Sequence, residues 1–210
     1  MDLKNTRINY TKNEINYNDI YDNPFEFFVE WINEAFLNNC LEPNSFVLST
    51  IEDNIPTSRV VLLKNIDHDG FVFYTNYDSS KSKHILINNN VSLNFFWPEL
   101  EKQVRVIGAA YKINDNVSDE YFASRPKESQ LGAILSEQSK KIDFNYDFNS
   151  KLIMLQEKYK NKDIKRPLNW GGFKVIPTKI EFWQGRPSRL HDRLLYKFKE
   201  GKWDKSRLSP

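Results

Sequence analysis

The hydrophobic positions of the chain follow two different spacings, one typical of a helix and one typical of strands. Between residues 24 and 38 the apolar side chains recur at steps of three and four residues, which predicts an amphipathic helix ending near Asn38. Asn23 and Pro24 stand at the beginning of this stretch and are typical of a helix start. Residues 1–22 are polar without a sustained period, so we expect a flexible N-terminal arm.

From Ser45 onward the apolar residues form short runs, rich in β-branched and aromatic side chains and separated by turn signals such as DHDG. The runs are SFVLSTI, SRVVLLKN, FVFYTN, VSLNFFW, QVRVIGAAYKI, KVIPTKIEFWQG and RLLYKF. Helical stretches are predicted at residues 80–88, 118–124, 127–136 and 148–160. We therefore expect residues 23–210 to form a single domain, mainly antiparallel β with flanking helices (α+β), whose strands make a closed or nearly closed barrel.

Composition and charge exclude several classes of function. Lys and Arg total 30 against 28 Asp and Glu, so the net charge of +2 would not draw the whole protein to nucleic acid or to a membrane. Cys40 is the only cysteine, which rules out an intramolecular disulfide and suits a reducing compartment. The N-terminus has no signal-peptide core, and no stretch approaches the roughly 20 apolar residues that span a bilayer. We expect a cytoplasmic protein.

Several catalytic motifs are absent from the sequence. The seven glycines form neither GxGxxG nor GxxxxGK[ST], so a bound phosphate would not be held by a Rossmann turn or a P-loop. The three histidines are too scattered for a zinc-protease pair, and no GxSxG elbow is present. We expect no metal site, and neither metal-dependent nor serine hydrolysis.

A basic stretch near the C-terminus, IEFWQGRPSRLHDR at residues 180–193, is the first candidate binding site. We interpret it as a strand, a turn and a resumed strand, so that alternation places Arg189, His191 and Arg193 on one face. Three potentially cationic groups in a row are unfavourable unless solvent or a bound anion neutralises them, which points to a phosphate-bearing ligand. A solvated edge strand is the alternative.

A second basic cluster combines a strand with the start of a helix. Arg59 and Lys81 offer positive charge to a phosphate, and Thr75 and Ser80 offer hydroxyl hydrogen bonds. The N-terminus of the predicted helix adds partial positive charge. Basic residues that flank hydrophobic strands also act as gatekeepers against aggregation, and the residues alone leave both interpretations open.

A series of motifs runs from about Asn23 to Pro210. In addition to IEFWQGRPSRLHDR it contains RVVLLK, FVFYTN, EKQVRVIG, YFASRPKESQLGA, the Gln138-Ser139 pair, NWGGFKV and the closing RLSP. Together these motifs resemble the pyridoxine/pyridoxamine 5′-phosphate oxidase family. The resemblance implies an FMN-binding split β-barrel of antiparallel Greek-key type, in a homodimer with two FMN sites at the interface. It also implies oxidation of pyridoxamine or pyridoxine 5′-phosphate to pyridoxal 5′-phosphate, with O2 as electron acceptor giving H2O2.

The resemblance further implies roles for individual residues. FMN contacts are expected from Arg59, Val60, Val61, Leu62, Leu63, Lys64, Tyr74, Thr75, Ser80, Lys81, Gln103, Gln138, Ser139, Trp183 and Arg193. Substrate contacts are expected from Arg7, Tyr10, Lys64, Tyr121, Arg125, Ser129, Arg189, Leu190 and His191, of which Arg189 and His191 are the expected catalytic residues. Plain alternatives are core aromatics for Tyr121 and Trp183, a strand-surface residue for Gln103 and a helix cap for Ser129.

The chain departs from the family pattern at two places. Ser80 stands where the family often has an Arg beside the phosphate-binding Lys, and the segment expected to cover the substrate, Arg7-Ile8-Asn9-Tyr10, is less basic than usual. Strand alternation also sets Arg59 and Lys64 on opposite faces, which suits contacts to different ligands and not to one shared phosphate.

Two other functions remain open from the sequence. One is a flavin- or pyridoxal-phosphate-binding split-barrel module without turnover, against which the intact Arg189, His191 and Arg193 argue. The other is a related oxidase acting on a different reduced ring, which the substrate-side Tyr121 and Arg125 disfavour. His191 is expected to orient the substrate, and proton transfer by His191 is the less favoured role.

Overall fold

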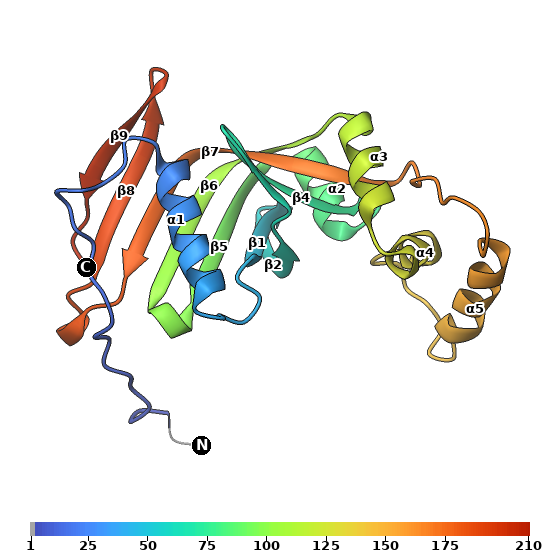
Figure 1. Ribbon diagram of the computed structural model, residues 1–210, viewed down its shortest axis with the longest axis horizontal. Helices are drawn as coiled ribbons and strands as arrows, with labels where there is room; N and C mark the ends of the chain where they lie inside the picture. The colour runs from blue at the N-terminus through green and yellow to red at the C-terminus, as the bar shows by residue number, and fades with distance from the viewer. Residues whose placement is uncertain (1–2) are drawn as a thin grey trace.

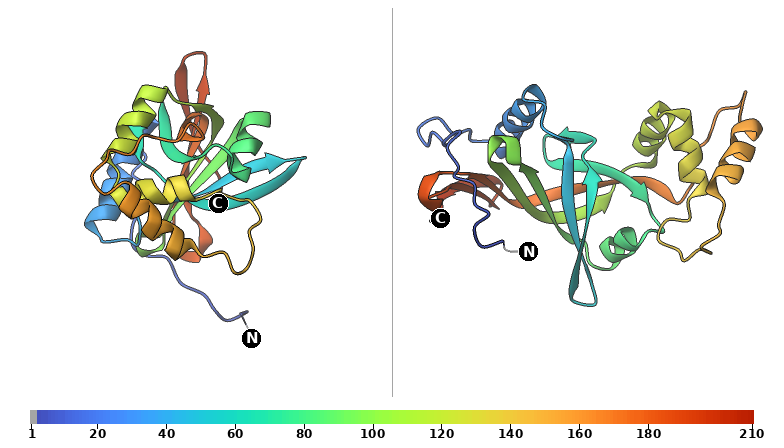
Figure 2. Two further views of the ribbon diagram at one scale, coloured as in Figure 1. Left: turned by 90° about the vertical axis from the view of Figure 1, so that its right-hand side faces the viewer. Right: turned by 90° about the horizontal axis from the view of Figure 1, so that it is seen from below.

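The computed structural model describes residues 3–210 and shows an antiparallel sheet flanked by helices (Figures 1 and 2). The strands are β1 Ser45–Glu52, β2 Ile55–Leu62, β3 Asn65–Asp67, β4 Gly70–Asn76, β5 Asn90–Trp97, β6 Lys102–Lys112, β7 Trp170–Gln184, β8 Asp192–Lys199 and β9 Lys202–Arg207. The helices are α1 Pro24–Leu37, α2 Ser80–Ile87, α3 Asp115–Ser124, α4 Lys127–Leu135 and α5 Phe148–Lys158, with 3-10 turns η1 Pro98–Leu100 and η2 Pro187–Arg189. These elements confirm the predicted strand runs and helices; the sequence pattern missed the short strand β3 and named no strand at β9.

The sheet is open, and its longest strand connects its two halves. Hydrogen bonds join the strands in the order β2-β1-β5-β6-β7-β4-β3, and β8 and β9 continue from β7. Along one edge, β7 pairs with β4 through residues 170–175 and with β8 through residues 179–184, while β6 runs along the other edge. Because this path ends at β2 and β3, the sheet is not closed, which agrees with the split barrel that the resemblance implies.

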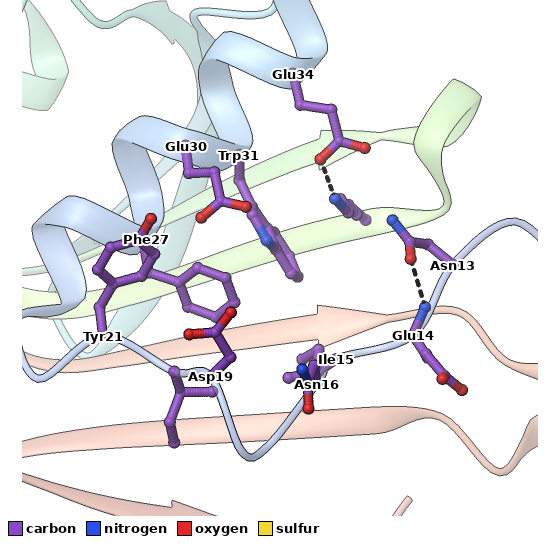
Figure 3. A pocket seen from close by; sticks show the side chains of 12 residues that line it. Asn13, Glu14, Ile15, Asn16, Asp19, Tyr21, Phe27, Glu30, Trp31 and Glu34 are labelled. Carbon is purple, nitrogen blue, oxygen red and sulfur yellow. Dashed lines mark hydrogen bonds and ion pairs between the residues drawn. The ribbon is translucent and has the colours of Figure 1, made fainter.

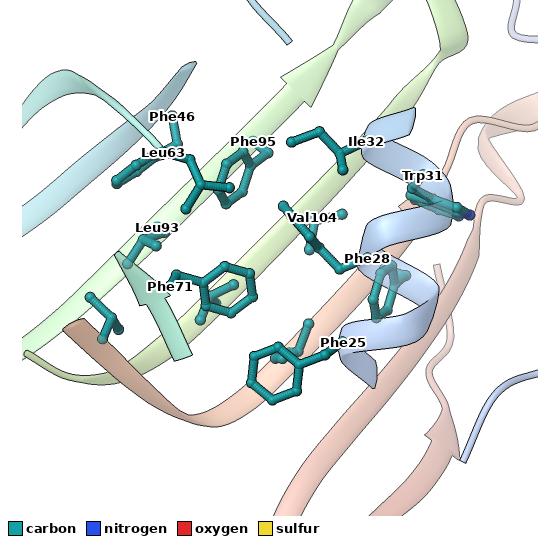
Figure 4. Close-up of a cluster of buried hydrophobic side chains, with 14 of the residues drawn as sticks. Phe25, Phe28, Trp31, Ile32, Phe46, Leu63, Phe71, Leu93, Phe95 and Val104 are labelled. Carbon is teal, nitrogen blue, oxygen red and sulfur yellow. The ribbon is translucent and has the colours of Figure 1, made fainter. Parts of the chain in front are cut away.

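Helix α1 covers one face of the sheet and forms much of the core. Phe25 and Phe28 project from it at a step of three residues (Figure 4). Phe28 is fully buried, with its ring centroid 5.0 Å from that of Phe71 and 4.9 Å from that of Phe95. Burial of a side chain of this size stabilises the fold by roughly 1.5–3 kcal/mol. The helix begins as predicted, because the Asn23 side chain accepts a hydrogen bond from the Phe25 N–H at 3.0 Å.

Part of the N-terminal segment lies against the body of the fold. The Glu101 carboxylate accepts hydrogen bonds from the backbone N–H groups of Thr11 and Lys12 at 2.9 and 3.0 Å. Asp192 accepts one from Ile15, whose side chain is buried. The segment and α1 enclose a cavity of about 450 Å³ with several carboxylates in its walls (Figure 3). The flexibility of residues 1–22 stays a prediction.

Candidate active site

A cavity of about 440 Å³ is lined by side chains from β2, β4, β7, α2, α3 and α4 and from the loops beside them. The lining residues are Val60, Val61, Leu62, Lys64, Tyr74, Thr75, Lys81, Tyr121, Arg125, Pro126, Ser129, Gln138 and Trp170. None of them is acidic, whereas Lys64, Lys81 and Arg125 are cationic. A cavity with this lining favours an anionic ligand. The fold therefore brings together most of the residues expected around phosphate groups, and we call this space the basic cavity.

Lys81 is a buried cation in the basic cavity, only 9% exposed. Its Nζ donates to the hydroxyls of Thr75 at 3.2 Å and Ser79 at 3.3 Å, and both partners are neutral. Burial and the positive charge of Arg59 lower the pKa of Lys81 to about 8. Arg59 itself donates only to neutral oxygens, so two neighbouring cations have no carboxylate partner within residues 3–210. Such a pair favours a bound anion.

Arg125 lies on another wall of the basic cavity. Its guanidinium stands over the Trp170 ring, 4.6 Å from the centroid, and burial lowers its pKa. Its Nη1 is buried without a hydrogen-bond partner in the described part of the chain. A buried donor without an acceptor is costly, so this atom marks a position for a ligand oxygen.

Stacked aromatic rings support this wall. The rings of Tyr74 and Tyr121 lie 3.8 Å apart between centroids at an interplanar angle of 16°, and Trp170 lies nearly parallel to both. Burial raises the pKa of Tyr74 to about 12, so its phenol stays protonated at neutral pH. Tyr121 thus lines the cavity as a half-buried residue and also packs against the smaller hydrophobic cluster around Trp170.

Other predicted residues lie at the edge of the basic cavity or outside it. Gln138 lines it and accepts a hydrogen bond from Thr75 at 3.4 Å. Ser80 is exposed at the first position of α2, and its N–H donates to the Ser139 hydroxyl at 3.3 Å. Leu63 is buried in the hydrophobic core, away from the lining. Ser129 lies inside α4 and not at its cap, which is Pro126.

A second cavity of about 630 Å³ contains most of the remaining predicted residues. Its lining residues are Thr6, Arg7, Ile8, Asn9, Tyr10, Trp183, Arg186, Ser188, Arg189 and His191. The Tyr10 ring meets Trp183 edge-on at 5.7 Å between centroids, and the His191 ring lies 4.6 Å from Trp183. We call this space the arm cavity. Leu190 is exposed beside it and is not part of its lining.

The local geometry of Arg189 and His191 differs from the predicted strand. Residues Pro187–Arg189 form a 3-10 turn in which Ser188 and Arg189 have positive φ, and β8 begins only at Asp192. Strand alternation therefore does not place Arg189, His191 and Arg193 on one face, and that prediction was wrong. Instead, His191 Nδ1 accepts a hydrogen bond from the Arg186 N–H at 3.1 Å. Burial, followed by the charge of Arg189, lowers the pKa of His191.

Gln103, Trp183 and Arg193 are neighbours across β6, β7 and β8. Arg193 donates from Nε to the Glu181 carboxylate at 2.8 Å and from one Nη to the Ser209 carbonyl at 2.9 Å. Arg193 therefore has a carboxylate partner, although Glu181 also pairs with Arg105 and so balances only one of the two positive charges. The sequence argument from three uncompensated cations is corrected on this point.

The two cavities lie far apart in one chain. Tyr74 pairs with Gly172 and Gln103 pairs with Trp183, a separation along β7 of 183 − 172 = 11 residues, or roughly 35 Å at about 3.3 Å per residue. In Figure 1, α2, α3 and α4 accordingly lie toward the right, and β8 with the N-terminal segment lies at the left. One chain does not bring the predicted residues around a single ligand.

Among the lining residues that the sequence reasoning missed, two directly contact a predicted site residue. Trp170, in the quoted NWGGFKV motif, supports Arg125, and Arg186 positions His191 through its backbone N–H. In the sequence, Trp170 was marked only weakly, as an aromatic residue directly before two glycines of a strand. No periodic signal marks Arg186, because its turn is irregular.

Comparisons with known proteins cover nearly the whole chain. Residues 32–148 match the family described as "Pyridoxamine 5'-phosphate oxidase", and residues 170–210 match "Pyridoxine 5'-phosphate oxidase C-terminal dimerisation region". A pyridoxine/pyridoxamine 5′-phosphate oxidase of Haemophilus ducreyi is 48% identical over 100% of both chains. The chain belongs to the pyridoxine/pyridoxamine 5′-phosphate oxidase family. A relative of the same name from Gloeothece citriformis is also 48% identical, over 99% of this chain and 98% of its own.

Solved structures agree with the split-barrel fold of this family. PhzG from Burkholderia lata, solved with tetrahydrophenazine-1-carboxylic acid, superposes with a TM-score of 0.88 at 24% identity, over 92% of this chain and 96% of its own. A pyridoxamine 5′-phosphate oxidase-related, FMN-binding protein of Nostoc punctiforme gives 0.75 at 15% identity, over 91% and 100%. Within residues 3–210, no helix is long and apolar enough to cross a membrane. As a family member the chain is an oxidase of vitamin B6 metabolism, and its C-terminal region indicates a homodimer.

Proposed function

We propose that the protein uses FMN to oxidise pyridoxamine 5′-phosphate and pyridoxine 5′-phosphate to pyridoxal 5′-phosphate, with O2 giving H2O2, and that it does so in the cytoplasm. The observation that carries this proposal is the basic cavity, which has three cations, no acid and the unpartnered Nη1 of Arg125. Two phosphates, one on the cofactor and one on the substrate, match these charges. The single cysteine supports a reducing compartment.

Arg59 and Lys81 suit the phosphate of FMN. Both are held by neutral oxygens and carry positive charge without a carboxylate partner in the described residues. Ser80 and Lys81 open α2, whose N-terminal N–H groups favour an anion. Bound FMN supplies the two-electron chemistry, while the protein binds and orients the reactants.

Arg125, with Lys64, Tyr121 and Ser129, suits the phosphate of the substrate. The Arg125 guanidinium is aligned by the Trp170 ring, so its unpartnered Nη1 meets a phosphate oxygen without a large rearrangement. Lys64 is exposed at the rim and adds a mobile charge. Hydroxyls of Tyr121 and Ser129 complete the set as donors.

The complete site is proposed to form at the dimer interface. The basic cavity of one protomer would face the arm cavity of its partner, so that the partner subunit's Arg189 and the partner subunit's His191 lie over the substrate ring. Two facts support this arrangement: the two cavities are far apart in one chain, and the arm cavity takes half of its lining from the family's dimerisation region, residues 170–210.

His191 is proposed to orient the substrate as a neutral imidazole. Its Nδ1 accepts from the Arg186 N–H, so the neutral ring carries its proton on Nε2 and presents a donor. The lowered pKa keeps this form dominant at neutral pH. Arg189 supplies the fixed positive charge beside it.

The direct test of the proposed function is an absorption measurement. The purified protein, reconstituted with FMN, should lose its flavin absorbance when pyridoxamine 5′-phosphate is added without oxygen, and regain it in air. A protein that binds FMN but does not bleach would be a binding module without turnover. A protein that cannot be reconstituted with FMN would contradict the proposal as a whole.

The affinity for FMN should fall as the pH rises above about 8. Lys81 is protonated below its lowered pKa and loses its charge above it, so binding a phosphate at higher pH requires uptake of a proton. The dissociation constant should rise by up to about tenfold per pH unit above that pKa. Flavin fluorescence titrations of the apoprotein across this range measure the effect. Lys81→Arg should flatten the profile, and an unchanged profile in that variant would contradict the assignment.

Ser80→Arg should bind FMN several-fold more tightly at low salt. The new guanidinium would lie beside the proposed phosphate site, where a charge-assisted hydrogen bond is worth roughly 1.5–3 kcal/mol before solvent screening. Because Ser80 is exposed, the gain should shrink as salt is raised. Titrations at two salt concentrations check both points. Unchanged or weaker binding at low salt would show that the phosphate does not lie beside residue 80.

A further inference from the structure

A buried histidine, His84, lies behind the proposed FMN phosphate site, and none of the steps above uses it. His84 projects from α2 and is only 5% exposed. Its Nδ1 lies 3.1 Å from the Thr50 hydroxyl and 3.3 Å from the Thr57 hydroxyl, on β1 and β2. Its Nε2 lies 3.2 Å from a carboxylate oxygen of Glu52. Both ring nitrogens are therefore engaged by specific partners.

The two threonine hydroxyls connect His84 to Arg59. One Nη of Arg59 donates to Thr50 Oγ1 at 2.7 Å, and the other donates to Thr57 Oγ1 at 2.8 Å. Arg59 in turn lies close enough to Lys81 for its charge to lower the pKa of Lys81. A chain of contacts thus runs from Glu52 on the surface, through His84 and the threonines, to Arg59, whose charge in turn acts on Lys81.

The proton positions in this chain follow from the chemistry of its groups. A carboxylate only accepts, so Nε2 of His84 donates to Glu52, and Nδ1 of the neutral ring is left as an acceptor. The Thr50 hydroxyl then donates to Nδ1, which turns its oxygen lone pairs toward Arg59. The Thr57 hydroxyl is then left to donate to Thr50 Oγ1 at 3.1 Å or to the Thr50 carbonyl at 3.5 Å. Without Nδ1 the Thr50 hydroxyl would turn to another partner, which would change the direction in which the two oxygens accept from the Arg59 guanidinium.

We infer that His84 is a positioning residue, which orders Thr50 and Thr57 so that they hold the Arg59 guanidinium for the phosphate of FMN. The inference rests on the proposed FMN site. It concerns cofactor affinity and not the oxidation step, since His84 lines neither cavity. Loss of the link should weaken FMN binding and leave the turnover number at saturating FMN unchanged.

The experiment compares three replacements of His84 by fluorescence titration of the apoprotein with FMN. His84→Leu removes both contacts and should raise the dissociation constant about five- to tenfold, the effect of about one hydrogen bond. His84→Asn keeps a polar atom at the place of Nδ1 and should bind FMN within about twofold of the wild type. His84→Gln reaches only toward Glu52 and should resemble His84→Leu. His68→Leu, a matched change at an exposed histidine, should have no effect.

A double-mutant cycle separates positioning from a merely structural role. In an Arg59→Lys background, the guanidinium that bonds to both threonines is absent, and His84→Leu should weaken FMN binding by less than about twofold. Equal effects in both backgrounds, or failure of His84→Asn to restore affinity, would overturn the inference. So would wild-type affinity in His84→Leu. If the wild-type protein itself binds no FMN, the proposed function fails and this inference fails with it. If the wild type binds FMN and His84→Leu binds it equally well, only this inference fails.

Discussion

Arg125→Ala should reduce kcat/KM for pyridoxamine 5′-phosphate by about a hundredfold, because a charged group typically contributes about 1.5–3 kcal/mol through each such hydrogen bond to a ligand. The affinity for FMN should change by less than about twofold, since Arg59 and Lys81 are proposed to hold that phosphate. Steady-state kinetics at saturating FMN and an FMN titration measure the two quantities.

The stability of the same variant provides the control. The unpartnered Nη1 of Arg125 and the lowered pKa of its guanidinium indicate that burial of this group is unfavourable without a ligand. The melting temperature of ligand-free Arg125→Ala should therefore equal or exceed that of the wild type. Arg125→Lys keeps the positive charge but lacks the planar guanidinium, and it should recover only part of the lost kcat/KM. A large fall in FMN affinity would show that Arg125 serves the cofactor.

Arg189→Ala should also lose about a hundredfold in kcat/KM, with FMN affinity nearly unchanged, because its proposed partner is the substrate ring. Arg193→Ala should weaken FMN binding about tenfold and leave kcat/KM nearly unchanged at saturating FMN. Glu181 keeps Arg105 as a partner when Arg193 is removed, which limits the effect on folding. If both variants lose FMN equally and turn over normally once reconstituted, the roles assigned to the two arginines are wrong.

Mixing the two inactive variants tests whether the site is shared between subunits. A heterodimer of an Arg125→Ala chain and an Arg189→Ala chain would contain one site with both arginines intact and one site with neither. Random exchange of subunits should restore about a quarter of wild-type activity, since half of the dimers are heterodimers and half of their sites are complete. No recovery after verified exchange would mean that both arginines act within one chain.

The sequence by itself determined the elements and the chemistry. The spacing of apolar residues defines α1 and most strands, because a side chain must face the core at every turn of a helix or at every second strand position. Its motifs also identified the family, and that resemblance grouped the cations of the basic cavity, although Lys64 and Arg125 lie between regular elements. The 3-10 turn at Pro187–Arg189 was not predictable, because two residues with positive φ follow no periodic pattern.

Only the tertiary structure decided which groups are compensated and which are not. Arg193 looked like a free cation in the sequence, yet Glu181 on the neighbouring strand pairs with it. Arg125 and Lys81 lack such partners within residues 3–210, and this depends on contacts between segments far apart in the chain. The long strand β7 likewise separates the two cavities, which no local pattern reveals. Local sequence specifies side chains and backbone periods, whereas charge balance and distance depend on how the sheet brings its strands together.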